Sequence, residues 1–269
     1  MAEQTSSRAA GGIARREATR TRRIVIAREA GLITSGVILY FVVRGLIDGR
    51  VAIAFRNADH VIGFERWAGI FVEPQLQAAT TDHAWLVEAL NVIYIYGHWP
   101  VVVITLGWLL LRHRDEYARF RNAILISGAI GLVIFAAFPV APPRFLPEFG
   151  FVDTVTENSS AYRVLQPPAF VNQYAAVPSL HFGWNLLLGI AWASLAGSAA
   201  ARLFGLVMPV LMLAAIVLTA NHYLVDGIAG GTIALIGLAI ANRIANGHRS
   251  PDQLNRAGAT ARRRPWQGP

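Results

Sequence analysis

Long apolar stretches separated by polar, arginine-rich segments dominate the pattern of this chain. A helix of about 20 predominantly apolar residues is long enough to cross a membrane. The pattern therefore predicts an all-α integral membrane protein with six transmembrane helices. We expect the first span to open with Ala30 to Val43 and to end near Arg44 to Ile47. The other five are expected at Ala84 to Leu111, Ala123 to Phe138, Phe182 to Leu195, Leu203 to Leu218 and Leu224 to Ile240. The second span contains Gly97 and Pro100 and should be kinked there.

Two other segments have a different pattern. Between Gly49 and Thr81, charged residues interleave with apolar ones, which is too polar to cross a bilayer. That pattern favours helices that lie in the membrane interface or pack over the mouth of the bundle. Between Pro139 and Val177 the chain is long and irregular, and such loops usually serve a function. We expect an interfacial helical segment after the first span and a functional loop between the third and fourth spans.

Composition supports a membrane protein and removes several kinds of chemistry. The chain is 54% hydrophobic and 15% charged, and it contains neither cysteine nor lysine. Thiolate nucleophiles, disulfides and lysine-based catalysis are therefore excluded. The net charge of +8 is concentrated at the ends, where we interpret residues 1–27 and 246–269 as basic tails around a membrane domain of residues 28–245. Without interleaved aromatic residues, these tails favour solvated segments over nucleic-acid binding.

Arginine positions predict how the chain crosses the membrane. In a six-span arrangement, both tails, the basic loop from Arg112 to Arg121 and the link with Arg202 all lie on one side. The positive-inside rule identifies that side as the cytoplasm. The long loop and the turn before His222 then lie outside. We therefore expect a multi-pass protein of the cell membrane with cytoplasmic termini and an extracytoplasmic site.

The candidate chemistry lies around two histidines. His222 and Asp226 are one helical turn apart, so the carboxylate can orient the imidazole and stabilise its charged form. His181 follows Ser179 closely at the start of the fourth span, and Arg144 enters the long loop after two prolines. Both histidines should sit at outer helix N-termini, which attract anions. Their convergence predicts a phosphate site.

These residue types are suited to phosphoryl transfer. Arg144 and Ser179 can bind phosphate oxygens, together with amides at the helix starts. His222, oriented by Asp226, can attack phosphorus and form a phosphohistidine, and His181 can protonate the leaving alkoxide. Water or an acceptor alcohol would complete the reaction. The chemistry requires no metal ion and no other cofactor, so we expect none.

The second span carries polar side chains, namely Glu88, Asn91, Tyr94, Tyr96 and His98. Polar groups at membrane depth are costly, so we expect these side chains to face the interior of the bundle. Asn91, Tyr94 and His98 are candidates for a substrate pocket. Hydrogen bonding between helices is the favoured interpretation for Asn91 and His98.

The motif residues resemble those of the type-2 phosphatidic acid phosphatase superfamily, the lipid phosphate phosphatases that share a fold with vanadium haloperoxidases. The run from Pro178 to His181 is similar to the second motif, and His222 with Asp226 matches the end of the third. Arg144 partly matches the first motif. The resemblance implies a six-span helical fold, with His222 as the nucleophile and His181 as the acid.

The sequence also departs from that pattern. The motif lysine and the third-motif arginine would fall at Ala137 and Ile216, and Leu180 replaces a glycine. This trimmed pattern is more similar to the inositol phosphorylceramide synthase branch, whose members transfer a phosphoalcohol between lipids. Arg163 or Arg44 is our hypothesis for the missing positive charge.

The leading hypothesis is a membrane enzyme that cleaves or transfers a phosphate ester of a phospholipid or polyprenyl phosphate. Whether it is a hydrolase or a transferase depends on what reaches the intermediate, and the sequence leaves this open. A transporter of an anionic lipid or solute is the main alternative. It does not readily account for the pair of His222 and Asp226. A haem protein with histidine axial ligands is a third possibility.

Overall fold

The computed structural model describes residues 50–158 and 172–247, together with residues 24, 27–29, 31–32, 34–36, 38–43 and 45. The chain forms two compact units, Met1–Leu46 and Ile47–Pro269. The described residues of the first unit are helical, and they include part of the first expected span. Arg44 and Arg163 lie outside the described residues, so our hypothesis about them stays a prediction.

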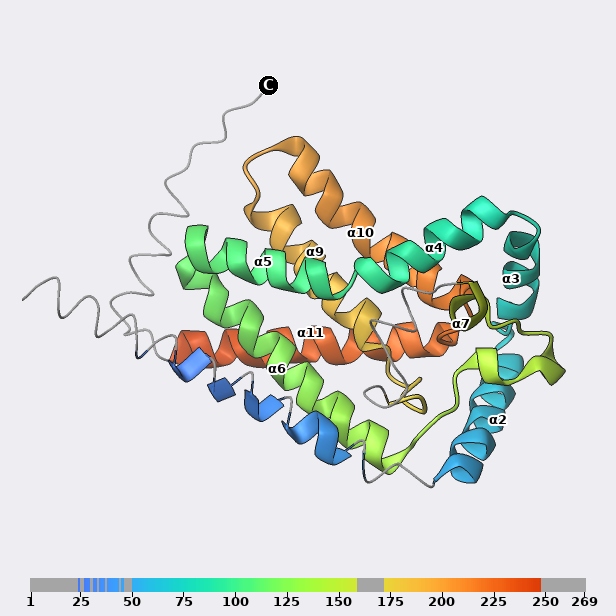
Figure 1. Cartoon of the computed structure of the whole chain (residues 1–269). Helices are drawn as coiled ribbons and strands as arrows, with labels where there is room; N and C mark the ends of the chain where they lie inside the picture. The colour runs from blue at the N-terminus through green and yellow to red at the C-terminus, as the bar shows by residue number, and fades with distance from the viewer. Residues whose placement is uncertain are drawn as a thin grey trace, which may run out of the picture. The chain divides into compact units, whose positions relative to one another are not determined.

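The described part of the second unit is built from helices (Figure 1), which confirms the all-α prediction. They are α2 (Val51–Ala68), α3 (Glu73–Thr81), α4 (Ala84–Tyr96), α5 (Trp99–Arg112), α6 (Arg114–Ala137), α7 (Thr154–Asn158), α9 (Leu180–Leu195), α10 (Ala199–Leu218) and α11 (Leu224–Gly247). Two single 3-10 turns, Pro143–Phe145 and Pro147–Phe149, follow α6. An isolated parallel bridge joins Val140 to Ala175 near the two ends of the long loop.

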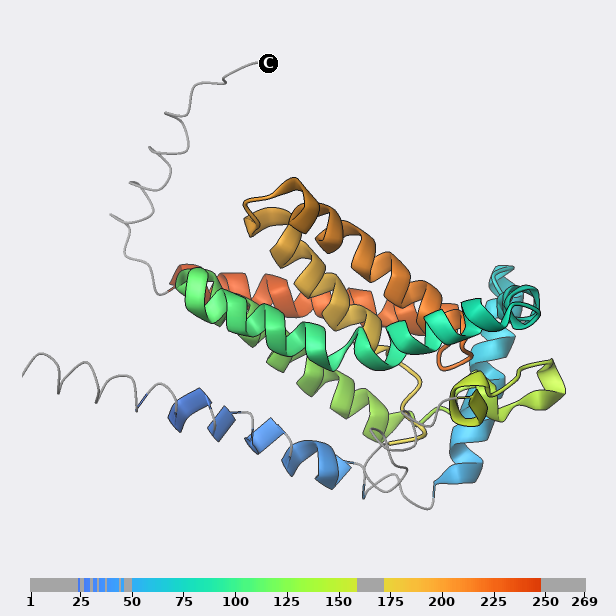
Figure 2. The same ribbon diagram turned by 45° about the horizontal axis from the view of Figure 1, so that its top comes forward.

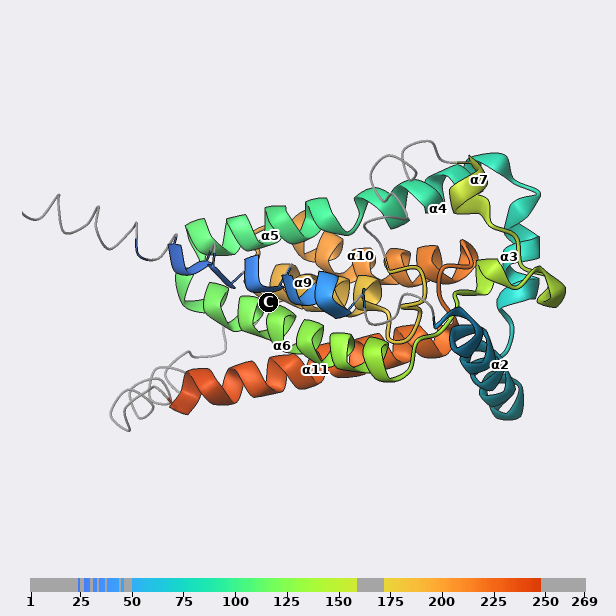
Figure 3. The same cartoon turned by 60° about the horizontal axis from the view of Figure 1, so that its bottom comes forward.

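Helix α9 is the centre of the bundle, because it contacts α5, α6, α10 and α11. Helices α4 and α5 lie along one side of α9 and α10, and α11 lies along another side (Figure 3). The core around α9 contains Leu187, Leu188 and Leu109, all fully buried. Helices α2 and α3 lie at the end of the bundle where α11 begins (Figure 2). This end also holds the residues singled out by the sequence.

The helices that could cross a membrane are fewer in the described residues than the six expected. Helices α6, α10 and α11 are long and apolar enough, and α4 with α5 would make a fourth if the pair is one bent span. Helix α9 is apolar but only 16 residues long. The kink in the second expected span is confirmed, since α4 and α5 meet at 45°. Gly97 ends α4, and Pro100 occupies the first turn of α5.

The expected basic loop from Arg112 to Arg121 is wrong. Helix α6 begins at Arg114, so most of this segment forms its first two turns. Arginine is a good helix former, and the acids Asp115 and Glu116 in the first turn interact favourably with the helix dipole. Arg119 also pairs with Glu116 at 2.8 Å. The arginines therefore extend a helix at its N-terminal end.

The segment after the first expected span is helical, as predicted. Helix α2 buries one face, with Ala54, Ala58, Ile62 and Glu65 spaced at helical intervals. This face packs in the cluster that contains Tyr223, at the start of α11. The two helices α2 and α3 therefore cover the end of the bundle.

The polar residues of the second expected span divide between two faces. Asn91, Tyr94 and His98 are buried, as predicted. Glu88 and Tyr96 are exposed, so the prediction that they face the interior is wrong. Glu88 and Tyr96 lie on the exposed face of α4 together with Trp85 and Val92. Asn91 and Tyr94 lie on its buried stripe, which also contains Val87, Leu90 and Ile95.

Candidate active site

The turn between α10 and α11 positions His222. Helix α11 begins at Leu224, where we expected the sixth span to begin, and His222 lies in the turn just before it. The amides of Asn221 and His222 both donate to the carbonyl oxygen of Ile216, at 3.1 and 3.0 Å. Ala220 adopts a left-handed φ of 54°, which reverses the chain within a short turn. The imidazole is thus held by a tight turn at the end of the bundle.

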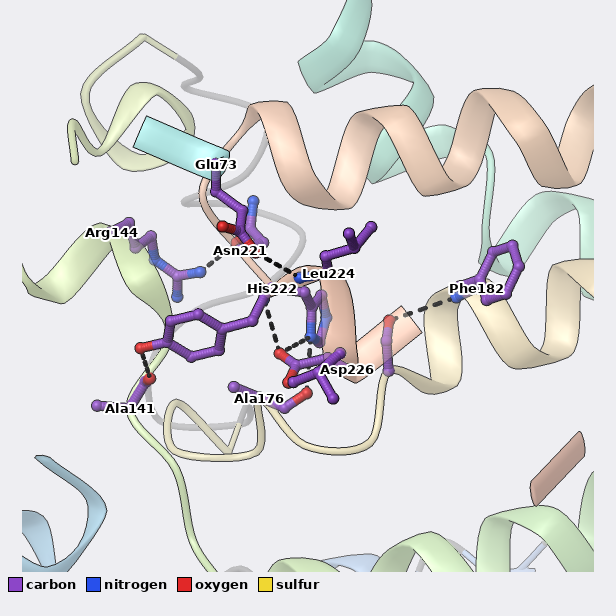
Figure 4. A network of polar contacts seen from close by, with 12 residues as sticks. Glu73, Ala141, Arg144, Ala176, Phe182, Asn221, His222, Leu224 and Asp226 are labelled. Atoms are coloured by element: carbon purple, nitrogen blue, oxygen red, sulfur yellow. Dashed lines mark hydrogen bonds and ion pairs between the residues drawn. The ribbon is translucent and has the colours of Figure 1, made fainter. Parts of the chain in front are cut away.

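The ring of His222 contacts two acceptors (Figure 4). Its Nδ1 lies 2.8 Å from the carbonyl oxygen of Ala176 and 3.4 Å from Oδ2 of Asp226. A carbonyl oxygen only accepts hydrogen bonds, so Nδ1 carries the proton. The expected contact with Asp226 is present, but the shorter bond goes to a backbone group. That arrangement leaves the lone pair on Nε2.

The surroundings of His222 favour its neutral form. Burial lowers the pKa of His222 to about 4, the hydrogen bond to Ala176 opposes this shift, and the positive charge of Arg144 adds to it. The side chain is 7% exposed. At neutral pH the imidazole is therefore uncharged, with Nε2 available as a nucleophile.

His181 lies in the first turn of α9, with its ring centroid 5.8 Å from that of His222. Its Nε2 is buried and makes no hydrogen bond within the described part of the chain. The rings of Tyr94 and His98 lie against it, at 4.7 and 4.3 Å between centroids. The spacing of the two histidines suits a single phosphoryl group, because attacking atoms approach to roughly 3 to 3.5 Å.

Ser179 caps α9. Its Oγ accepts a hydrogen bond from the amide of Phe182 at 3.4 Å (Figure 4). The first backbone bond of the helix, from Gly183 to Ser179, follows at 3.0 Å. The amides of Leu180 and His181 precede that bond and point to the start of the helix. The serine is thus already engaged as a cap, with its hydroxyl proton left for a ligand.

The three candidates for a substrate pocket have different surroundings. Tyr94 and His98 line the ring of His181, and Nδ1 of His98 also lies 3.4 Å from Nδ2 of Asn185. Asn185 in turn donates to the carbonyl of His181 at 2.8 Å. Asn91 instead donates to the carbonyl of Thr154 at 3.0 Å, which ties α4 to α7. The sequence offered no reason to single out Asn185.

Arg144 reaches the turn of His222 from the 3-10 turn after α6. Its amide donates to the carbonyl of Ala220 at 2.8 Å, and its Nη1 donates to Oδ1 of Asn221 (Figure 4). Its Nε lies 3.7 Å from Oδ2 of Asp153. The guanidinium side chain is 6% exposed. Sequence reasoning anticipated Arg144 but not its contacts with Asn221 and Asp153.

The start of α11 is occupied by carboxyl groups. Oε1 of Glu73 accepts from the amide of Leu224, and Oε1 of Glu65 accepts from the amide of Val225, each at 2.8 Å. We expected this helix end to bind phosphate. That expectation is wrong for these two amides, because protein carboxyls already bond them. At the start of α9, no carboxyl group among the described residues bonds the first amides.

Backbone contacts join the start of α9 to α11. The amide of Ser179 donates to the carbonyl of Asp226 at 2.9 Å. A Cβ on Gly230 would lie 2.0 Å from the carbonyl oxygen of Ser179, and one on Gly183 would lie 2.4 Å from that of Gly230. Side chains are therefore excluded from this seam, which brings the two histidines together. In the described residues, no group of three or more His, Asp or Glu side chains could hold a metal ion.

Comparison with known proteins gives a family. The model of the PAP2 superfamily matches residues 59–240. A curated relative, the phosphoinositol dihydroceramide synthase of Bacteroides thetaiotaomicron, is 26% identical in an alignment of 186 residues that covers 63% of this chain. The chain spans 60% of the length of that relative. No solved structure matches the chain.

The family match confirms the resemblance to this superfamily seen in the sequence. The curated relative confirms the similarity to the inositol phosphorylceramide synthase branch. The family match covers more than half of the chain and includes Arg144, His181 and His222. This chain belongs to the PAP2 superfamily.

Proposed function

We propose that this protein is a membrane enzyme that cleaves or transfers the phosphate ester of a lipid through a phosphohistidine on His222. The observation that carries the proposal is the state of that ring. Its Nδ1 is bonded to the carbonyl of Ala176, and burial keeps the pKa at about 4. An uncharged imidazole with a directed Nε2 is a ready nucleophile.

In the first step, Nε2 of His222 attacks phosphorus and a P–N bond forms. Burial and the nearby charges of His222 and Arg144 lower the pKa of His181 to about 3 in the free protein, so the step requires a phosphate substrate that brings the proton or favours the imidazolium by its negative charge. The P–O bond to the lipid leaving group breaks, and the His181 imidazolium gives its Nε2 proton to that oxygen and becomes neutral. The ring of His222 becomes positively charged, with the Ala176 carbonyl at 2.8 Å and Asp226 at 3.4 Å to stabilise it. Arg144 and the amides at the start of α9 stabilise the phosphoryl oxygens.

In the second step, water or a lipid alcohol attacks phosphorus. His181 now takes the proton of the attacking oxygen, the P–N bond breaks, and His222 returns to its neutral form. Water as acceptor makes the protein a phosphatase. An alcohol makes it a phosphotransferase.

For the substrate, we propose a phospholipid whose phosphoalcohol head group passes to a second lipid. The relative is named a phosphoinositol dihydroceramide synthase, which supports transfer of an inositol phosphate. Arg163 or Arg44 remains our proposal for a second phosphate-binding arginine. The arginine distribution supports an extracytoplasmic site in the cell membrane, with six spans and both termini in the cytoplasm.

The test uses purified full-length protein in detergent micelles with phosphatidylinositol labelled in its phosphate. With dihydroceramide present, the wild type should form a labelled second lipid, and without an acceptor it should release inositol phosphate slowly. Phosphatidic acid and a polyprenyl pyrophosphate are assayed in parallel. His222→Gln should lower every rate by at least about 10³-fold, because the nucleophile is lost. His60→Gln, at an exposed position of α2, is the matched control.

The intermediate gives a second measurement. Rapid quenching should trap labelled protein that survives alkali and is lost in acid, as expected for a phosphoramidate, and His222→Gln should remove this label. A transporter without chemistry would give neither product nor label. Equal label in the wild type and in His222→Gln would overturn the assignment of His222.

A further inference from the structure

Three carboxyl groups meet at the start of α11, one each from α2, α3 and α11. Glu65, Glu73 and Asp226 are all 0% exposed. Each carboxyl accepts a hydrogen bond from one of three consecutive amides, those of Val225, Leu224 and Tyr223 respectively, at 2.8, 2.8 and 2.9 Å. A helix start attracts negative charge, but three buried carboxylates would repel one another strongly.

One proton removes much of this repulsion. The second oxygen of Glu65 and the second oxygen of Glu73 are both buried, and neither has a hydrogen-bond partner among the described residues. The two side chains lie within hydrogen-bonding reach of each other. A hydroxyl on Glu65 that donates to Glu73 satisfies both oxygens at once. The pair then carries one negative charge.

The groups that face Glu65 agree with this assignment. Burial, the hydrogen bond with Glu73 and the nearby charges of Glu73 and Asp226 raise the pKa of Glu65 to about 9, against the opposing bond from Val225. The phenol of Tyr223, in the adjacent turn, has its pKa raised by burial and by the same carboxyls. Through Asp226 the cluster also reaches His222, at 3.4 Å. These carboxyls do not form a cation site within the described residues.

We propose that Glu65 and Glu73, joined by a shared proton, are positioning residues that fix the first turn of α11 and, through it, His222 and Asp226. The inference rests on the proposed role of His222 as the nucleophile. The bonded amides of Leu224 and Val225 come directly after His222 and Tyr223 in the chain. Helices α2 and α3 thereby hold the start of α11 and the turn that carries His222 in place. We call these two contacts, of Glu65 with Val225 and of Glu73 with Leu224, the clamp.

The clamp predicts an alkaline limit to activity. When Glu65 loses its proton, two carboxylates face each other in a buried space, and one helix must withdraw from its amide. The turn then loosens, and the bond from His222 to Ala176 is no longer held in place. Wild-type turnover should therefore fall as the pH rises through about 9, where Glu65 ionises.

Infrared spectroscopy tests the shared proton without any assay of activity. At pH 7 the wild type minus Glu65→Gln difference spectrum should contain the C=O band of a protonated carboxyl, and this band should vanish as the pH rises through about 9. Glu148→Gln, at an exposed position, should leave the band unchanged. In Glu73→Gln the band should disappear at a lower pH, because the ionised partner is gone. A difference spectrum without the band would refute the shared proton.

The pH profile of turnover tests the positioning role. Glu65→Gln keeps a neutral side chain of the same shape, so it should retain at least a third of wild-type turnover at pH 7 and lose the alkaline limit. Glu65→Ala should lose tenfold or more at every pH. Thermal unfolding of each variant checks folding. An unchanged alkaline limit in Glu65→Gln would overturn the positioning role, and this outcome is separate from the result for His222→Gln.

Discussion

A methyl group added at Gly230 should separate the helices that carry His181 and Asp226. The Cβ of alanine at this position would lie 2.0 Å from the carbonyl oxygen of Ser179 and 2.8 Å from its carbonyl carbon. Ordinary contact begins at 3.4 Å, so the helices must move apart by more than 1 Å. Both contacts are backbone atoms, which cannot rotate away as the end of a side chain can.

The added methyl group should also disturb the candidate site, because Gly230 lies in the seam between α9 and α11. Gly230 is one turn after Asp226, and the amide of Ser179 donates to the carbonyl of Asp226 at 2.9 Å. Separating the helices breaks this bond and moves His181 away from His222. A displacement of about 1 Å in a catalytic group costs on the order of 10²-fold in rate. Overpacking should also lower the free energy of unfolding by roughly 1 to 3 kcal/mol.

The assay measures lipid phosphate transfer and thermal unfolding on the same purified variants. Gly237→Ala is the matched control, because its Cβ would lie 2.7 Å from the carbonyl of Ala123, in the seam between α11 and α6 away from the histidines. It should lose stability but keep turnover per folded molecule. Gly247→Ala meets nothing within 4 Å and should change neither property. Equal turnover in Gly230→Ala and Gly237→Ala would refute the seam as the source of the geometry.

Three further predictions concern charge, pH and topology. Asp153→Asn removes the carboxylate 3.7 Å from Arg144, so a phosphate substrate no longer competes with it, and KM should fall roughly twofold to fivefold. An unchanged KM in steady-state assays would contradict this competition. Folding lowers the pKa of His222 from 6.5 to about 4. The free energy of unfolding should therefore be highest above pH 6.5 and should decline as the pH falls to 4, because the unfolded chain binds a proton at His222 first. His222→Gln should remove this decline, on the order of 3 kcal/mol, in thermal unfolding measured at several pH values. Because the chain has no cysteine, an impermeant maleimide should label Glu148→Cys in intact cells but Ala200→Cys only after permeabilisation. The reverse pattern would invert the proposed topology.

Several features of this protein follow from local properties of the sequence. The apolar stretches predicted helices α10 and α11 and the C-terminal end of α6 closely, because length and hydropathy are local properties of a stretch. The break at Gly97 and Pro100 was also predictable, since it depends on local backbone chemistry. The motif spacing of His222 and Asp226 indicated a pair, and the structure places the two side chains 3.4 Å apart.

Other features depend on segments that are distant in sequence. The carbonyl that bonds His222 comes from Ala176, 46 residues earlier, and a backbone carbonyl leaves no signal in a sequence pattern. Glu65 and Glu73 lie 160 and 151 residues before the amides that they bond. In α2 and α3, acids between apolar residues are typical of a solvated face.

The sequence by itself therefore determined the helical class, the family motifs and the residue types of the site, because these are properties of short segments. Only the tertiary structure decided which groups hold those residues in place. A carboxyl can be buried only where amides or a shared proton compensate its charge, and such partners are supplied by packing between distant helices. That is why α2 and α3, which carry no recognised motif, complete the candidate site.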